Sequence, residues 1–163
     1  LAWCWATSTS YDTRLLLRGN RFFDLMDYDK AIATYNQALN EFPSNHEIRA
    51  ALALTYKQRG DYYRAVTEYK YLINSNPDNA ALHNNLGTVY YRNEQYDLAI
   101  EEYRKAIQLD DNLVAAYGNL GLVFLKKGNA KEAIPFLRKV FQNEEDMLKY
   151  LLLIYNPNHE QTG

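Results

Sequence analysis

The sequence contains few of the residues that cross-link, kink or strongly charge a protein. Its 163 residues include one cysteine, Cys4, which excludes an intrachain disulfide and a cysteine-based metal cluster. Seven glycines and four prolines are too few for the many tight turns of an all-β fold. The formal net charge is only -2, so we expect no nucleic-acid partner. No apolar stretch reaches the roughly 20 residues that a transmembrane helix needs.

Residues 1–11 form an N-terminal segment that differs from the rest of the chain. It opens with Leu-Ala-Trp-Cys-Trp-Ala and has no initiator methionine. Three interpretations remain open: the end of a secretory signal, a membrane anchor, or part of another upstream domain. We therefore expect a remnant of an upstream region. The compartment stays open between the cytoplasm and an exported or membrane-anchored location.

The dominant feature is an internal repeat with a period of 34 residues and no gaps. It defines four units, 12–45, 46–79, 80–113 and 114–147. Three columns illustrate the period: Ala31, Ala65, Ala99 and Ala133; Gly19, Ala53, Gly87 and Gly121; and Tyr35, Tyr69, Tyr103 and Leu137. The small residues predict close approach of two helix backbones, and the rings fill the space beside that approach.

Each unit has the spacing of two helices. In the third unit, Leu82, Leu86, Val89 and Tyr90 recur at helical intervals, which excludes strand alternation. A helix pair cannot bury its apolar side alone, so we expect the pairs to stack. Residues 147–155 have the composition of a helix that covers the last pair. We accordingly assign 148–163 to a capping helix and a tail.

Local signals predict where some helices begin. Ser44-x-x-Glu47 and Asn129-x-x-Glu132 have the pattern of N-terminal capping boxes. Pro135 falls early in a second helix, so we expect that helix to start late or to bend slightly.

The motif Leu86-Gly87-x-x-Tyr90, followed by Tyr96-x-x-Ala99 and Tyr103-x-x-Ala106, resembles the tetratricopeptide repeat, over residues 12–147. The resemblance implies an all-α, right-handed superhelical solenoid of antiparallel helix pairs. This sequence departs from the family pattern at five positions, and at two of them Asp111 and Glu145 replace the closing proline. Arg18 replaces a leucine, which predicts a first helix with one side in water. Met26 and Glu94 replace the usual turn glycine, which predicts a changed turn or local strain.

Signals for catalysis and cofactor binding are weak. The sequence has no H-E-x-x-H, phosphate-binding glycine loop or G-x-S-x-G motif. We interpret His83 as a packing residue and the paired acids Glu101 and Glu102 as a solvated face. The sequence therefore predicts no enzyme, no metal and no cofactor.

In the resembling family, inward positions of the first helices line a concave groove that holds partner peptides. Carried to this sequence residue by residue, the resemblance implies the binding residues Leu16, Asn20, Phe23, Leu54, Lys57, Asn84, Asn85, Thr88, Tyr91, Arg92, Asn119, Leu122, Leu125 and Lys126. Such a groove mixes apolar and hydrogen-bonding groups, which suits an extended peptide or an amphipathic helix.

We therefore expect a non-catalytic scaffold that binds a segment of another protein and helps to assemble a complex. The alternative is a structural protein that forms homo-oligomers through the leucine-rich capping helix, residues 148–155. A fold alone does not decide between them.

Overall fold

The computed structural model describes residues 10–155, and all regular structure in that range is α-helical. The chain divides into two units, residues 1–77 and 78–163. The first unit contains α1 (Tyr11–Asp24), α2 (Tyr28–Glu41), α3 (His46–Arg59) and α4 (Tyr62–Ser75). The second contains α5 (Ala80–Arg92), α6 (Tyr96–Leu109), α7 (Val114–Lys126), α8 (Ala130–Leu137) and α9 (Glu144–Tyr155). The predictions for residues 1–9 and for the tail from Asn156 lie outside the described residues.

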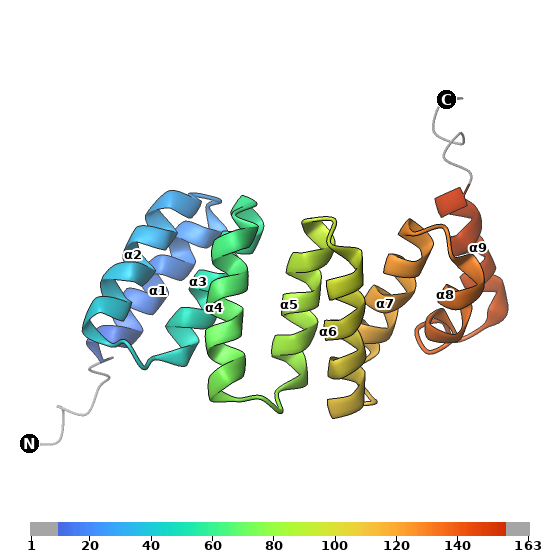
Figure 1. The fold of residues 1–163 in the computed structure, drawn as a ribbon. Helices are drawn as coiled ribbons and strands as arrows, with labels where there is room; N and C mark the ends of the chain where they lie inside the picture. Colours follow the sequence, from blue (N-terminus) through green and yellow to red (C-terminus); the bar gives the residue numbers. More distant parts are fainter. Residues whose placement is uncertain (1–9, 156–163) are drawn as a thin grey trace, which may run out of the picture. The chain divides into compact units, whose positions relative to one another are not determined.

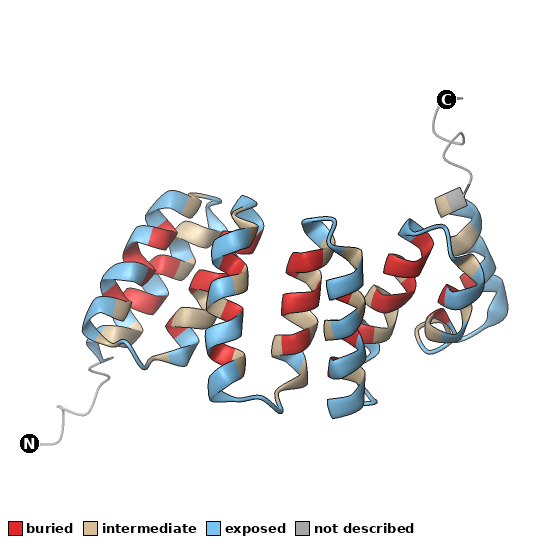
Figure 2. Ribbon diagram, in the orientation of Figure 1, coloured by how far each residue is buried: buried red, intermediate tan, exposed pale blue. Residues whose placement is uncertain are grey.

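Consecutive helices form antiparallel pairs, α1 with α2, α3 with α4, α5 with α6 and α7 with α8 (Figure 1). Within the first unit α2 also packs on α3, and within the second α6 packs on α7. Buried residues face neighbouring helices while exposed residues cover the outer sides (Figure 2). The predicted all-α fold of stacked helix pairs is confirmed. None of the described helices combines the length and hydropathy needed to cross a bilayer.

The small-residue column lets aromatic rings lie directly on the backbone of the first helix in a pair. A Cβ atom added at Gly87 would lie 2.7 Å from Cε1 of Tyr103, and one added at Gly121 would lie 2.6 Å from Cδ2 of Leu137. Tyr103 is 1 % exposed, so its ring has little room to move. The predicted backbone approach is therefore confirmed at these pairs.

The turns inside the helix pairs all use a left-handed residue. Gly60 and Gly128 adopt φ angles of 88° and 79°, which glycine tolerates. Met26 and Glu94 occupy the same place with φ angles of 58°, a region that is costly for residues with a Cβ atom. The predicted local strain at these two turns is confirmed.

Helix starts differ from the sequence prediction in detail. The N-cap of α3 is Asn45, not Ser44, because the Asn45 carboxamide oxygen accepts a hydrogen bond from the backbone N–H of Ile48 at 3.1 Å. Asn129 does precede α8, but its side chain caps no backbone group there. Its Nδ2 instead donates to Glu132 at 3.1 Å.

The last two helices also depart from expectation. α8 starts at Ala130, the equivalent of Tyr96 in α6, so Pro135 does not delay it. It ends early, at Leu137, and the backbone N–H groups of Lys139 and Val140 then bond three residues back, to the carbonyls of Phe136 and Leu137. α9 begins at Glu144, before the predicted start. Met147 is its buried anchor, and the ring of Tyr150 lies 5.2 Å from that of Phe141.

We predict that Gly87→Ala lowers the free energy of unfolding by about 1–3 kcal/mol, because the new methyl group overlaps the fixed Tyr103 ring. Gly118→Ala is the matched control. Its Cβ would lie 3.5 Å from Val140, an ordinary contact, and alanine favours the helix by up to about 1 kcal/mol. Denaturant unfolding followed by circular dichroism measures both. Equal stability of the two variants would refute the close-approach account.

Candidate functional site

In the first unit, the predicted binding residues divide into buried and accessible ones. Leu16 and Lys57 are 8 % and 7 % exposed, so both contribute mainly to packing. The Nζ atom of Lys57 lies 6.0 Å from the ring of Tyr69. Asn20, Phe23 and Leu54 are half-buried and present part of their surface on the first helices of the two pairs.

In the second unit, α5 and α7 bring polar predicted residues together. Nδ2 of Asn119 on α7 donates to Oδ1 of Asn84 on α5 at 3.0 Å. Thr88, one turn further along α5, donates to the Asn84 carbonyl at 2.9 Å. Asn84, Asn85, Thr88 and Asn119 are all half-buried. We call this surface, with Tyr91, Arg92, Leu122 and Lys126, the α5–α7 face.

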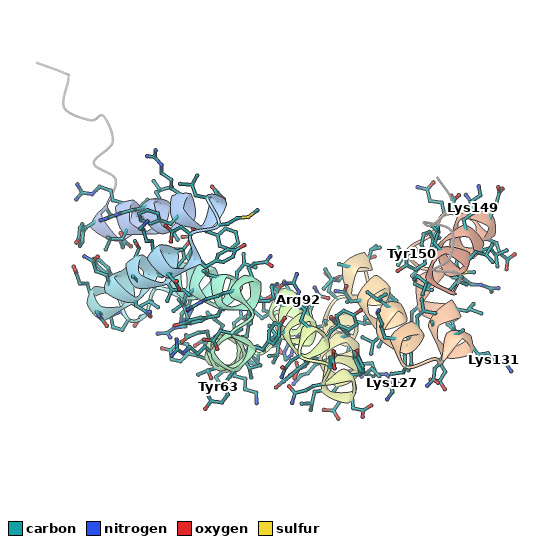
Figure 3. The ribbon with its side chains drawn as sticks, turned by 90° about the horizontal axis from the view of Figure 1, so that it is seen from above. Tyr63, Arg92, Lys127, Lys131, Lys149 and Tyr150 are labelled. Carbon is teal, nitrogen blue, oxygen red and sulfur yellow. The ribbon has the colours of Figure 1, made fainter. Side chains whose placement is uncertain are left out.

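Tyr91 gives the α5–α7 face an aromatic end. Its ring centroid lies 5.9 Å from that of Tyr96 on α6. Burial raises the pKa of Tyr91, and repulsion from the Tyr96 and Tyr150 phenolates raises it further. Arg92 on α5 is exposed beside it, and Tyr150 belongs to α9 (Figure 3). Sequence reasoning missed Tyr150, since no signal in the capping helix indicated that its ring approaches Tyr91.

The α7 contribution is uneven. Leu122 is half-buried and Lys126 exposed, so both offer surface. Leu125 is 5 % exposed and is chiefly a packing residue.

Two buried tyrosine hydroxyls hold the polar residues of these faces in place. Tyr35 donates to Oδ1 of Asn20 at 2.6 Å, and Tyr103 donates to Oγ1 of Thr88 at 3.2 Å. The two bonds occupy equivalent positions, since both partners are 68 residues apart. Burial raises the pKa of Tyr35 and of Tyr103 to about 12, so both stay protonated donors at neutral pH.

Each of the two middle helix pairs contains a charged or polar contact that sequence reasoning did not find. In α3 and α4, Arg49 lies 2.7 Å from Glu68. In α5 and α6, Nδ1 of His83 lies 2.7 Å from Glu102. His83 is 2 % exposed and packs as predicted, but Glu102 is half-buried, so its assignment to a solvated face is wrong. The 34-residue spacing of both partners was the available signal.

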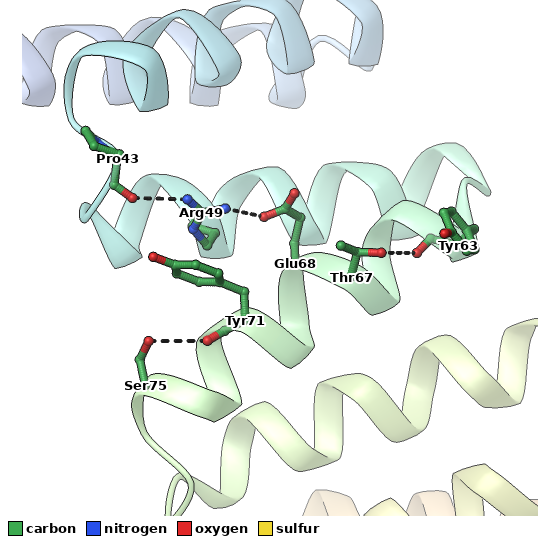
Figure 4. A network of polar contacts seen from close by, with 7 residues as sticks. All are labelled: Pro43, Arg49, Tyr63, Thr67, Glu68, Tyr71 and Ser75. Atoms are coloured by element: carbon green, nitrogen blue, oxygen red, sulfur yellow. Dashed lines mark hydrogen bonds and ion pairs between the residues drawn. The ribbon is translucent and has the colours of Figure 1, made fainter.

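Arg49 is held from three sides (Figure 4). Nη1 contacts Glu68, Nη2 donates to the Pro43 carbonyl at 3.0 Å, and the guanidinium carbon lies 3.8 Å from the centroid of the Tyr71 ring. Its buried Nε has no hydrogen-bond partner among the described residues. The same positions carry Leu15 and Thr34 in the first pair, where no charge is present.

We predict that Glu68→Thr lowers the free energy of unfolding by about 2 kcal/mol, because it leaves the Arg49 guanidinium largely buried without a carboxylate. The double variant Arg49→Leu/Glu68→Thr copies the pair in α1 and α2 and should recover more than half of that loss. A double-mutant cycle by denaturant unfolding checks this. Additive losses from the two single substitutions would contradict the coupling.

Sequence comparison identifies the repeats. A family profile described as TPR repeat matches residues 19–59, 54–94 and 89–128, and one described as Tetratricopeptide repeat matches residues 114–146. The chain belongs to the tetratricopeptide repeat family. Repeats of this kind are typical of protein-interaction scaffolds and not of enzymes, and among residues 10–155 no three His, Cys, Asp or Glu side chains gather to hold a metal ion.

Solved structures of MamA have the same fold. MamA from residue 41 to its end, from Desulfovibrio magneticus RS-1, is 23 % identical with a TM-score of 0.75; the match covers 83 % of this chain and 76 % of that one. A crystal structure of MamA is 26 % identical with a TM-score of 0.73, covering 86 % of this chain and 82 % of that one. A comparison with curated proteins gives no significant match.

Proposed function

We propose that this protein is a scaffold that binds an extended or helical segment of another protein on the α5–α7 face and thereby helps to assemble a complex. The four 34-residue repeats supply the scaffold, and we expect α9, which buries Met147, to cover part of the last helix pair. The observation that carries the proposal is the bridge from Asn119 to Asn84, which orients two side-chain amides at the surface without burying them.

The chemistry of this face suits a polypeptide. Side-chain amides both donate and accept hydrogen bonds, as a peptide backbone requires. The half-buried rings of Tyr91 and Tyr96, whose centroids lie 5.9 Å apart, offer an apolar platform for a side chain of the bound segment, and aromatic residues dominate the energetics of such contacts. Leu122 adds a second apolar contact on α7. We therefore expect a segment with two separated apolar anchors.

We predict that Tyr91→Ala/Arg92→Ala weakens binding of the partner about 30-fold, the usual effect of losing about 2 kcal/mol at a tyrosine–arginine contact. The partner is first identified by affinity capture with the wild-type chain, and its dissociation constant is then measured by calorimetry with purified proteins.

Tyr63→Ala/Arg64→Ala is the matched control for this prediction. It removes the same two residue types from α4, where Tyr63 is 84 % exposed on the outer side of the helix pair (Figure 3). Circular dichroism verifies that both variants fold. If the control weakens binding as much as the Tyr91/Arg92 variant, the α5–α7 face is not the binding surface.

A second function, homo-oligomerisation through α9, is favoured by one observation. Leu148, Leu152 and Leu153 of α9 are 52 %, 65 % and 72 % exposed, although leucines at helix surfaces of monomers are usually covered. We predict that, if copies associate through this face, Leu152→Glu abolishes the oligomer seen by light scattering. Leu98→Glu on α6, which is 40 % exposed, is the control and should leave the oligomer intact. A monomer at all concentrations excludes this second function.

A further inference from the structure

The outer side of α1 carries an unusual group of arginines. Arg14, Arg18, Arg21 and Leu25 follow one another at intervals of three or four residues, Leu17 lies beside Arg18, and all five are exposed. That spacing places them along one side of a helix. We call this surface the arginine face. It lies apart from the predicted binding positions of α1, which occupy the other side of the helix.

The arginines replace residues that are deeply buried in other repeats. In the other hairpins of each unit, α3 packs on α2 and α7 packs on α6. The positions of α3 and α7 equivalent to 14, 18 and 21 are all buried. Those positions hold Ile48, Leu52 and Thr55 in α3, and Ala116, Leu120 and Val123 in α7, all at most 1 % exposed. Three guanidiniums cannot enter an apolar helix contact of that kind without a large desolvation cost. The arginine face is therefore unsuited to receive another apolar helix of the array.

These three guanidiniums are not neutralised by neighbours. Four other arginines in the described residues pair with carboxylates: Arg49 with Glu68, Arg59 with Asp29, Arg64 with Asp61 and Arg138 with Glu144. No ion pair joins Arg14, Arg18 or Arg21 to any residue within 10–155. Arg14 and Arg18 lie over the rings of Tyr11 and Phe22 of their own helix, at 5.6 Å and 5.8 Å. Asp24 is an exposed carboxylate near the end of α1.

Apolar side chains accompany this positive charge. Leu17 is 56 % exposed, and at the end of α1 the exposed fractions of Leu25 and Met26 reach 69 % and 75 %. The sequence just before α1, residues 1–10, has no charged residue and includes Leu1, Trp3 and Trp5. Tryptophan favours the boundary between lipid and water, and arginine binds phosphate oxygens in bidentate fashion.

We propose that the arginine face binds the surface of a membrane that contains anionic phospholipid. The three guanidiniums contact lipid phosphates, and Leu17, Leu25 and Met26 enter the headgroup region. An acidic helix of another protein would satisfy the arginines equally well. The membrane is favoured because leucines that stand out singly among arginines, next to an uncharged tryptophan-bearing segment, match a lipid interface better than a groove for one helix.

The test uses the full chain with unilamellar vesicles of phosphatidylcholine alone or with about one third phosphatidylglycerol. Sedimentation gives the partition coefficient. Trp3 and Trp5 are the chain's only tryptophans, so their emission reports on this end of the molecule alone. We expect binding to the anionic vesicles only, with a blue shift of the tryptophan emission. Binding should weaken as NaCl rises from about 0.1 M to about 0.5 M.

Arg14→Gln/Arg18→Gln/Arg21→Gln should lower the partition coefficient about 100-fold, since each cation near an anionic surface contributes roughly fivefold. Arg59→Gln/Arg64→Gln/Arg138→Gln is the matched control. It removes the same charge from arginines that already have carboxylate partners and should change the coefficient less than about threefold. Circular dichroism verifies that both triple variants fold.

Three outcomes would overturn the proposal. The first is no binding to the anionic vesicles, and the second is equal binding to the neutral ones. The third is an equal loss in the two triple variants. If the chain ignores vesicles but binds a poly-glutamate peptide in a manner that requires Arg14, Arg18 and Arg21, the arginine face is assigned to an acidic protein instead.

Discussion

The fold depends on one contact within each helix pair. A side chain of the second helix packs directly on the backbone of the first helix, at a residue that has little or no side chain. Tyr103 over Gly87 and Leu137 over Gly121 set how closely the helices approach. The ring is buried by this approach, and its hydroxyl then reaches across to a residue on the exposed side of the first helix. Thus one steric condition both holds the pair together and fixes Thr88 on the proposed binding face. The same buried tyrosine therefore belongs to the folded core through its ring and supports the proposed binding face through its hydroxyl.

The 34-residue period could be found from the sequence because the same packing recurs in each unit. A position that is ambiguous in one unit can therefore be assigned from the equivalent positions in the others. Features that occur once gave no such help. The cap of α3 moved from Ser44 to Asn45 because either side chain can cap, and only the backbone geometry decides. The early end of α8 and the early start of α9 both fall in the second half of the fourth unit, 114–147, where the chain departs from the helix pattern of the other units.

For the candidate site, the sequence predicted which face of a helix each side chain occupies, but it did not predict how deeply that side chain is buried. Leu16, Lys57 and Leu125 occupy positions expected to face a partner, yet neighbouring helices cover them. Hydrophobic periodicity shows which face of a single helix is apolar, whereas the burial of a residue depends on which side chains of the neighbouring helix pack against it. Tyr150 was missed for the same reason, because its approach to Tyr91 depends on how α9 folds back. The predicted residues that remain accessible include Leu54 and Leu122 as well as polar and aromatic side chains, so each unit keeps a chemically mixed surface.

The fourth residue of each repeat unit and the residue 19 positions after it differ along the chain. They are Leu15 and Thr34, Arg49 and Glu68, His83 and Glu102, and Tyr117 and Phe136. Arrays of near-identical units are prone to misassembly, in which a helix joins the wrong mate. If α3 paired with α8, Arg49 would be enclosed beside Phe136 with nothing to balance its charge. These residues therefore disfavour pairing of the first helix of a middle hairpin with the second helix of an outer hairpin.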